Sequence, residues 1–255
     1  VIFSNKDTTG YSVPLESYEI KLHQGANMVG SPFPFPVRAE WNEGVSQPYK
    51  YGSDLKEGWA DTNVFEPWAG YAVQSTSDSG KITFYPIQDT TIAARTANSG
   101  WRLNLDLSSN SSFDRTSAIG RCDACEENVD MNDMLLLPSL TQRVYISLDI
   151  SNDGQFDHSK DLRSTSEFNG VWNMRVNRPN AEESLTLKGA YENDRPNDLV
   201  LMIVNVSTRE VLKNFPLESF ELSNMNSEFN DFKIVAGEEA YVCLLYTSPS
   251  PRDRQ

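Results

Sequence analysis

The chain has 255 residues, and its 36 Asp and Glu outnumber its 22 Lys and Arg, so its formal net charge is −14. This charge argues against nucleic-acid binding, because a phosphate backbone requires a cationic surface. The length allows one or two domains, and no run of about 18 apolar residues is present, so we expect no membrane insertion.

The N-terminal part, residues 1–98, predicts a small β module rich in proline and aromatic residues. Apolar side chains alternate over Tyr18–Leu22 as in a half-buried strand. Prolines at alternate positions of 32–36 stiffen the chain, so we expect an extended segment with Phe33 and Phe35 on one side. We interpret it as a buried crossover, with a peptide-like recognition surface as the alternative. The best helical candidate is Ser53–Trp59, about two turns at most.

The same module is rich in Trp and Tyr. Such side chains either build the core of a small β module or, when exposed, stack on sugar rings. The stretch Val64–Val73 places a turn before a strand, which favours core packing. The alternative is a glycan-binding surface made by Trp41, Trp59 and Trp68, and the exposure of these indoles decides between the two.

Residues 99–242 predict an antiparallel two-sheet sandwich, immunoglobulin-like or jelly-roll-like, so the whole chain is expected to be all-β. The small polar segment Thr96–Gly100 marks the boundary. Short alternating runs follow it, separated by Gly, Asn, Asp, Pro and Ser. These runs are Trp101–Leu107, Val144–Leu148, Trp172–Val176, Leu185–Leu187 and Phe232–Ile234. Leu199–Val206 is apolar on both faces, which predicts a central strand, and Ser207–Glu210 predicts a hairpin turn.

Cys122 and Cys125 form a C-x-x-C pair in an acidic loop. The spacing allows a redox site, half of a zinc site or a local disulfide. A redox motif should open a helix after a buried strand, and a structural zinc site needs four ligands. Neither pattern is present nearby, so we expect a short surface disulfide or two unreactive thiols.

The segment Asp149–Asp161 resembles the start of a calcium-binding loop, with oxygen-bearing side chains at alternate positions and Gly154 in sixth place. Its twelfth position is Lys160 rather than Glu, and no helical pattern flanks it, which argues against an EF-hand. The alternative is a turn that Asp, Asn and Gly stabilise by local hydrogen bonds. If a metal binds, we expect Ca²⁺, held by Asp149, Ser151, Asp153, Asp157 and Asp161.

The sequence contains no G-x-S-x-G, no H-E-x-x-H and no phosphate-binding glycine loop. A Ser-His-Asp triad would have to use His23 or His158. The first ends an alternating run and the second lies in the acidic loop, and both positions favour solvated or capping residues. We therefore assign no catalytic and no cofactor-binding residue, and we expect that the chain is not an enzyme.

The last thirteen residues, 243–255, resemble the translation of a transposase sequencing adapter, from Cys243 to Asp253. Val1 is not an initiator Met and no signal peptide follows it, so we expect a fragment of a longer protein. We leave 243–255 out of the fold prediction and expect this tail to have no defined packing.

Several stretches of 1–242 together resemble a region of secreted and surface proteins of the Bacteroidetes–Ignavibacteria type. They are Gly25–Pro36, Glu66–Tyr71, Val144–Leu148, Asp161–Arg163, Val171–Met174 and Asp231–Gly237. In those proteins the similar region lies just before a type IX secretion sorting domain, and the domain upstream is often a subtilisin-like peptidase. The resemblance implies a secreted or cell-surface location.

Together these observations predict a non-catalytic accessory or spacer region of an exported bacterial protein, attached to a catalytic or surface domain in the same chain. The alternative is a carbohydrate-binding module that serves an upstream secreted peptidase or glycosidase, with extracellular polysaccharide as partner. We expect no nucleic-acid partner and no required cofactor, and Ca²⁺ is the one candidate ligand ion.

Overall fold

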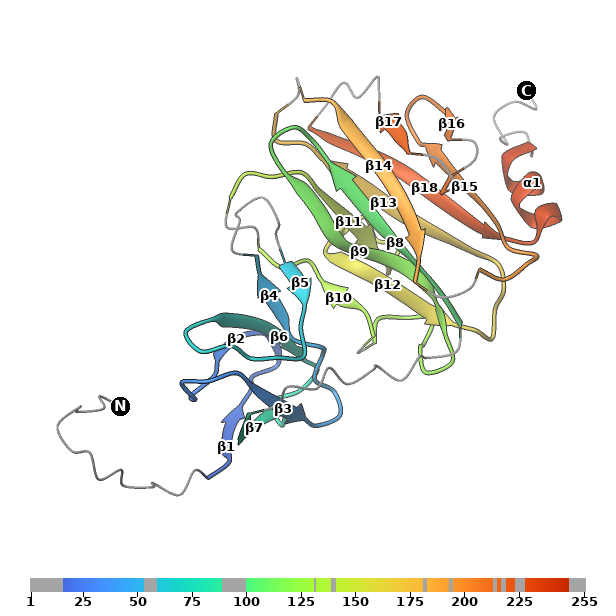
Figure 1. Ribbon diagram of the computed structural model, residues 1–255. Helices are drawn as coiled ribbons and strands as arrows, with labels where there is room; N and C mark the ends of the chain where they lie inside the picture. The colour runs from blue at the N-terminus through green and yellow to red at the C-terminus, as the bar shows by residue number, and fades with distance from the viewer. Residues whose placement is uncertain are drawn as a thin grey trace, which may run out of the picture.

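The computed structural model describes residues 16–52, 59–88, 100–130, 132–138, 141–180, 183–192, 195–212, 215–216, 219–222 and 228–247. Within these ranges the chain forms 18 strands and one short helix, and the strands are arranged in three sheets. The all-β prediction is therefore confirmed. Figure 1 shows a small N-terminal module beneath one end of a larger sandwich.

Two antiparallel sheets form the module. One sheet has the order β1 (Tyr18–Lys21), β7 (Lys81–Gln88), β3 (Val37–Trp41). The other has the order β2 (Gly25–Gly30), β6 (Gly70–Ser75), β4 (Tyr49–Tyr51), β5 (Trp59–Asp61). Their apolar side chains meet in one core, in which Phe65 contacts two aromatic rings. Its ring centroid lies 4.5 Å from that of Tyr71 and 4.9 Å from that of Phe84, so aromatic packing holds the module together.

The proline-rich segment crosses from β2 to β3. Phe33 is buried in the module core, and its ring stacks on that of Phe35 with centroids 5.7 Å apart, which favours the crossover interpretation. The helical candidate lies outside the described residues at 53–58, and Trp59 begins strand β5. The proposed boundary also lies outside them at 96–99; the module's last described strand ends at Gln88 and the sandwich begins at Gly100.

Eleven strands form the sandwich as one long sheet that folds into two layers. One layer has the order β16 (Val211–Leu212), β15 (Val200–Asn205), β18 (Phe229–Gly237), β13 (Gly170–Asn177), β11 (Tyr145–Asp149). The other has the order β12 (His158–Ser164), β9 (Phe113–Cys122), β8 (Gly100–Ser108), β14 (Leu185–Tyr191), β17 (Phe220–Leu222), with β10 (Met134–Leu135) beside β12. A single residue pair, Leu148 with His158, joins β11 to β12, so the sheet turns its corner there.

Alternation with a period of two places the apolar side chains of both layers between them. In β8, Trp101, Leu103, Leu105 and Leu107 are buried, whereas the residues between them are more exposed. The ring of Trp172, from β13 in the other layer, lies 5.7 Å from that of Trp101 between centroids. Full burial of one large apolar side chain contributes about 1.5–3 kcal/mol, so this shared interior is the main source of the sandwich's stability.

Three features of the sandwich bear on the sequence expectations. The hairpin prediction is confirmed, because β15 pairs with β16 across the turn and lies between β16 and β18. The strand pairs described in the sandwich are antiparallel as predicted, except that β9 and β12 pair in parallel from Ala118 beside Lys160 to Cys122 beside Ser164. Cys122 and Cys125 form a disulfide as one alternative predicted, but both are buried rather than on the surface.

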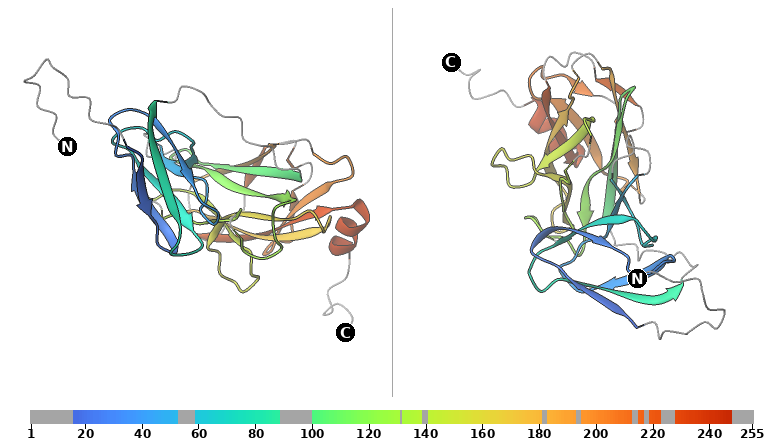
Figure 2. Two further views of the ribbon diagram at one scale, coloured as in Figure 1. Left: turned by 90° about the horizontal axis from the view of Figure 1, so that it is seen from below. Right: turned by 90° about the vertical axis from the view of Figure 1, so that its left-hand side faces the viewer.

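A helix, α1 (Glu239–Thr247), follows the last strand and lies against β15 and β18. Cys243, Leu244 and Leu245 are exposed, so the expected lack of defined packing in the tail is not contradicted, and 248–255 lie outside the described residues; residues 243–247 nevertheless continue the helix. The physical reason is that the tail's first residues are mostly helix-compatible and continue a turn begun before them. Val242 is the buried contact, whereas Leu244 is 65% exposed. Figures 1 and 2 show α1 and the module at opposite ends of the molecule.

Candidate functional site

The module meets the sandwich through a small apolar junction. Its side chains come from β4, β5 and β6 on one side and from the segment around β10 on the other. The buried members are Tyr49, Trp59, Ala72, Met134 and Leu137. Trp59 Nε1 also donates to the carbonyl oxygen of Pro138 at 3.3 Å, and the N–H of Leu135 donates to Gln74 Oε1 at 3.1 Å. The junction thus combines burial with hydrogen bonds, as a domain core does.

A buried lysine of β12 lies at this junction. Lys160 is 3% exposed, and its Nζ donates to the hydroxyl of Tyr49 at 3.0 Å and to Asp61 Oδ1 at 3.1 Å. The ammonium also lies 4.7 Å from the centroid of the Tyr49 ring. A displacement that kept Lys160 buried but moved its partners would leave an uncompensated charge. These contacts therefore fix the relative position of module and sandwich.

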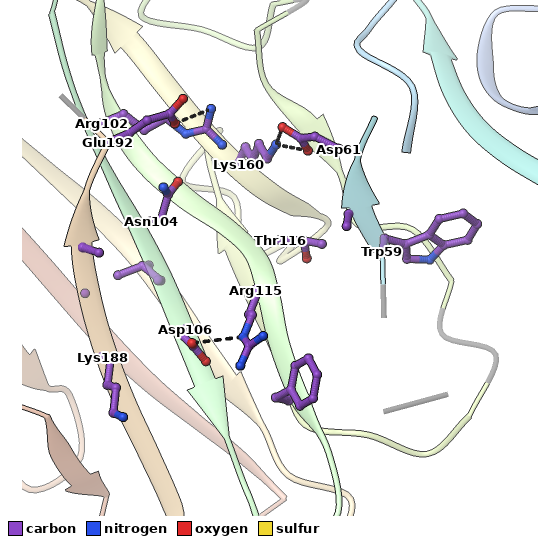
Figure 3. Close-up of a pocket in the computed structure, with 15 residues that line it drawn as sticks. Trp59, Asp61, Arg102, Asn104, Asp106, Arg115, Thr116, Lys160, Lys188 and Glu192 are labelled. Atoms are coloured by element: carbon purple, nitrogen blue, oxygen red, sulfur yellow. Dashed lines mark hydrogen bonds and ion pairs between the residues drawn. The ribbon is translucent and has the colours of Figure 1, made fainter. Parts of the chain in front are cut away.

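Beside the junction the same surfaces form an open groove of about 700 Å³ (Figure 3). Its walls are β5 of the module and the outer faces of β8, β9 and β14, and Lys160 of β12 reaches it. The charged side chains that line it are Asp61, Arg102, Asp106, Arg115, Lys160, Lys188 and Glu192. The volume lies within the range of roughly 300–1,000 Å³ that ligand sites occupy.

Ion pairs hold most of these charged groups in place. Arg102 Nη1 lies 3.0 Å from Glu192 Oε2, and Arg115 Nε lies 3.2 Å from Asp106 Oδ2. Lys188 makes no hydrogen bond or ion pair with any residue that the structure describes. The groove therefore has four cationic groups and three carboxylates, in a chain whose net charge is −14.

A β-bulge directs Arg115 to the groove. The register of β8 with β9 shifts by one residue at Asp106, which therefore faces both Arg115 and Thr116. The fully buried carboxylate of Asp114 stabilises the bulge by accepting hydrogen bonds from Thr116 N–H at 3.0 Å and Thr116 Oγ1 at 2.6 Å. As a result Arg115 is exposed beside Asp106, as Figure 3 shows.

The three predicted Trp residues do not share one exposed surface. Trp68 is 95% exposed at a turn with φ of 64°, and Trp41 is half-buried against the module core. Trp59 is 4% exposed and lies edge-on to Tyr51 with ring centroids 5.0 Å apart. In Figure 3 its ring points away from the groove. Two of the three indoles thus pack inside the protein, and Trp68 is the exception.

The loop predicted to bind calcium is a turn between β11 and β12. Asp149 is 3% exposed, and its carboxylate accepts hydrogen bonds from the N–H groups of Asp153 at 3.3 Å and Gly154 at 3.0 Å. Asp153 accepts from the N–H of Gln155 at 2.9 Å, and Ser151 is exposed. These contacts are those of a turn stabilised by Asp, the alternative interpretation of this segment.

The two remaining predicted ligands, Asp157 and Asp161, face other partners. Asp157 Oδ1 lies 2.7 Å from His158 Nδ1, and the guanidinium of Arg163 donates to the two oxygens of Asp161 at 3.0 and 2.8 Å. In the part of the chain that the structure describes, no three His, Cys, Asp or Glu side chains are placed to hold a metal ion. Calcium binding by these residues stays a prediction.

The two histidines lie in different environments. His23 is exposed, and its Nδ1 lies 3.9 Å from Asp78. His158 is buried, and its Nε2 has no hydrogen-bond partner. The pair of His158 with Asp157 is therefore not completed by a serine hydroxyl, which a hydrolytic triad would require.

One carboxyl group close to the junction is strongly perturbed. Asp133 is buried, and its oxygens accept hydrogen bonds from the N–H groups of Leu162 at 2.8 Å and Asp130 at 2.9 Å. Burial raises its pKa to about 8, because desolvation of the carboxylate outweighs these two bonds. Asp133 directly precedes Met134, so its ionisation takes place next to the apolar junction.

Sequence reasoning missed the groove. A signal was present, because polar residues 102, 104 and 106 alternate with the buried apolar residues of β8. That pattern alone describes any solvated strand face. The groove also needs β14 beside β8 and the module in front of them, and pairing between distant strands is not visible in one sequence.

No protein-family model, curated protein or solved structure matches this chain. Within the described residues, no helix is both long and apolar enough to cross a membrane. The function is therefore proposed from the geometry of the junction and the groove.

Proposed function

We propose that this chain is a non-catalytic accessory and spacer region of an exported bacterial protein, secreted or held at the cell surface, and that it is type IX secretion cargo. The observation that carries the spacer role is the buried junction between module and sandwich. A spacer transmits a fixed distance and orientation only when its parts do not move independently, and linked domains otherwise move by default.

The junction resists such movement in two ways. Its apolar members lose contact with one another if the module tilts, and each exposed methylene group costs about 0.8 kcal/mol. Lys160 also fixes the orientation of the module on the sandwich, because both of its polar partners, Tyr49 and Asp61, belong to the module. The module and α1 lie at opposite ends, so the unit is long enough to separate what is attached to it.

The proposed location rests on other observations. Disulfides such as Cys122–Cys125 persist mainly in oxidising compartments outside the cytosol. The net charge of −14 suits an exposed surface, and the resemblance to regions before type IX sorting domains supports the route. Antibodies against this chain should detect the parent protein in the medium or outer-membrane fraction of its source cells; detection only in the cytosol would contradict export.

Scanning calorimetry tests the spacer role. We expect one unfolding transition for the native chain and two for Met134→Asp, because a charge in the junction uncouples the module from the sandwich. Asp61→Ala is a milder variant that leaves Lys160 without its carboxylate partner, and it should shift the module's melting towards lower temperature. Val206→Asp, at a site 48% exposed, is the control and should melt like the native chain. Two separate transitions in the native chain would contradict the proposal.

A second candidate function is carbohydrate binding on behalf of an upstream hydrolase. The open groove favours it, rather than the three Trp residues that the sequence suggested. A groove of about 700 Å³ rich in charged and amide side chains resembles a site for a polar ligand more than one for an apolar ligand.

A further inference from the structure

We propose that the groove binds an acidic oligosaccharide built of uronic acid units, an inference that rests on the second candidate function. The groove is lined by four neighbouring strands of one sheet, β12, β9, β8 and β14, and by β5, so its side chains are positioned by regular structure (Figure 3). A site of this kind is formed before the ligand arrives, which lowers the entropic cost of binding.

Two groove cations have donors that the protein does not use. Arg102 pairs with Glu192 through Nη1, yet its Nε is a buried donor without a hydrogen-bond partner. Lys188 stands opposite Asp106 in the sheet register, but the carboxylate of Asp106 is bound by Arg115. A carboxylate on the ligand would pair with the exposed ammonium of Lys188, and hydrogen bonds between ions are stronger than those between neutral groups.

The other groups of the groove suit sugar hydroxyls. Asn104 lies between Arg102 and Asp106 on the outer face of β8 and offers both a donor and an acceptor. The carboxylates of Asp106 and Glu192 accept hydrogen bonds from hydroxyl groups. Ala190, which pairs with Asn104 in the register, is small and exposed, so the centre of this face is open to a flat ring.

The aromatic residues and the charge balance argue against a neutral sugar. The ring of Trp59 points away from the groove, and the guanidinium of Arg115 covers the ring of Phe113 at 4.3 Å from its centroid. Among the described residues that line the groove, neither aromatic ring thus presents an open platform to a neutral sugar: Trp59 points away and Arg115 occupies one face of Phe113. The excess of one cation over the carboxylates instead favours a ligand that carries negative charge.

Calorimetric titration of the full chain with a galacturonic acid tetramer tests the inference, and a neutral glucose tetramer is the control ligand. The acidic tetramer should bind at least about tenfold tighter than the neutral one, and added salt should weaken it. Equal or tighter binding of the neutral tetramer would refute the claim that the ligand is acidic, but it would still support carbohydrate binding. No binding of either at about 10 mM would overturn both, without bearing on the spacer role.

Three variants locate the binding in the groove. Lys188→Gln should weaken binding of the acidic tetramer about tenfold, and Glu192→Gln should tighten it by removing a like charge. Lys233→Gln is the matched control, since Lys233 is an exposed strand lysine on the other layer of the sandwich. Circular dichroism of each variant checks that it is folded. An unchanged affinity in Lys188→Gln, or an equal loss in Lys233→Gln, would overturn the assignment to the groove.

Discussion

The buried carboxylate of Asp114 ties the two layers of the sandwich together at their corner. It accepts hydrogen bonds from Ser117 Oγ at 3.0 Å and from the N–H of Ile146 at 2.9 Å, besides two from Thr116. Arg143, which is also buried, lies 3.9 Å away. Ile146 belongs to the other layer, so this side chain replaces strand pairing where the two layers share a single residue pair.

We expect Asp114→Ala to lower the free energy of unfolding by about 3–5 kcal/mol, because it leaves four donors without this acceptor and removes the carboxylate beside the buried guanidinium of Arg143. Asp114→Asn keeps one acceptor oxygen and should lose about half as much. Urea titration followed by Trp fluorescence measures both. Asp106→Ala is the control, since its exposed ion pair with Arg115 is worth less than about 1 kcal/mol. A loss below about 1 kcal/mol in Asp114→Ala would refute the claim that Asp114 holds the two layers together.

Three further predictions concern the buried acids and the helix. Burial raises the pKa of Asp133 to about 8, so the folded state keeps a proton that the unfolded state releases above about pH 4. Stability should therefore fall as pH rises from about 4 to about 8, and Asp133→Asn should flatten this fall in urea titrations at several pH values. Asp149→Ala should cost about 1–2 kcal/mol in both calcium and EGTA, because its bonds are to backbone N–H groups. If calcium raised the melting temperature of the native chain but not that of Asp149→Ala, the result would support calcium binding by this loop. Val242→Ala should cost about 1–2 kcal/mol by thermal melting while Leu244→Ala costs almost nothing, and equal effects would show that α1 does not pack as described.

The sequence was informative wherever one strand face is apolar. The alternation of Trp101–Leu107 and Trp172–Val176 predicts both core strands, because burial of one face is a local property of the chain. The hairpin after β15 is local too. The helical backbone of 243–247 was not predicted, because a resemblance to foreign sequence says nothing about whether residues continue a helix that begins before them.

What the sequence could not provide is the pairing of distant segments. The parallel contact of β9 with β12 and the insertion of Lys160 between Tyr49 and Asp61 join residues that are far apart in the chain. The twelfth position of the Asp149–Asp161 loop drew attention to Lys160 only as a departure from a calcium motif. Its role follows from burial at the junction, which periodicity does not encode.

The central claim is that module and sandwich form one rigid unit. The most direct measurement is the distance distribution between spin labels at Lys81→Cys in β7 and Lys233→Cys in β18, with Cys243→Ser to remove the third thiol. Double electron–electron resonance should give a single narrow distribution that Val206→Asp leaves unchanged and Met134→Asp broadens. A broad or bimodal distribution in the otherwise native chain would contradict the account.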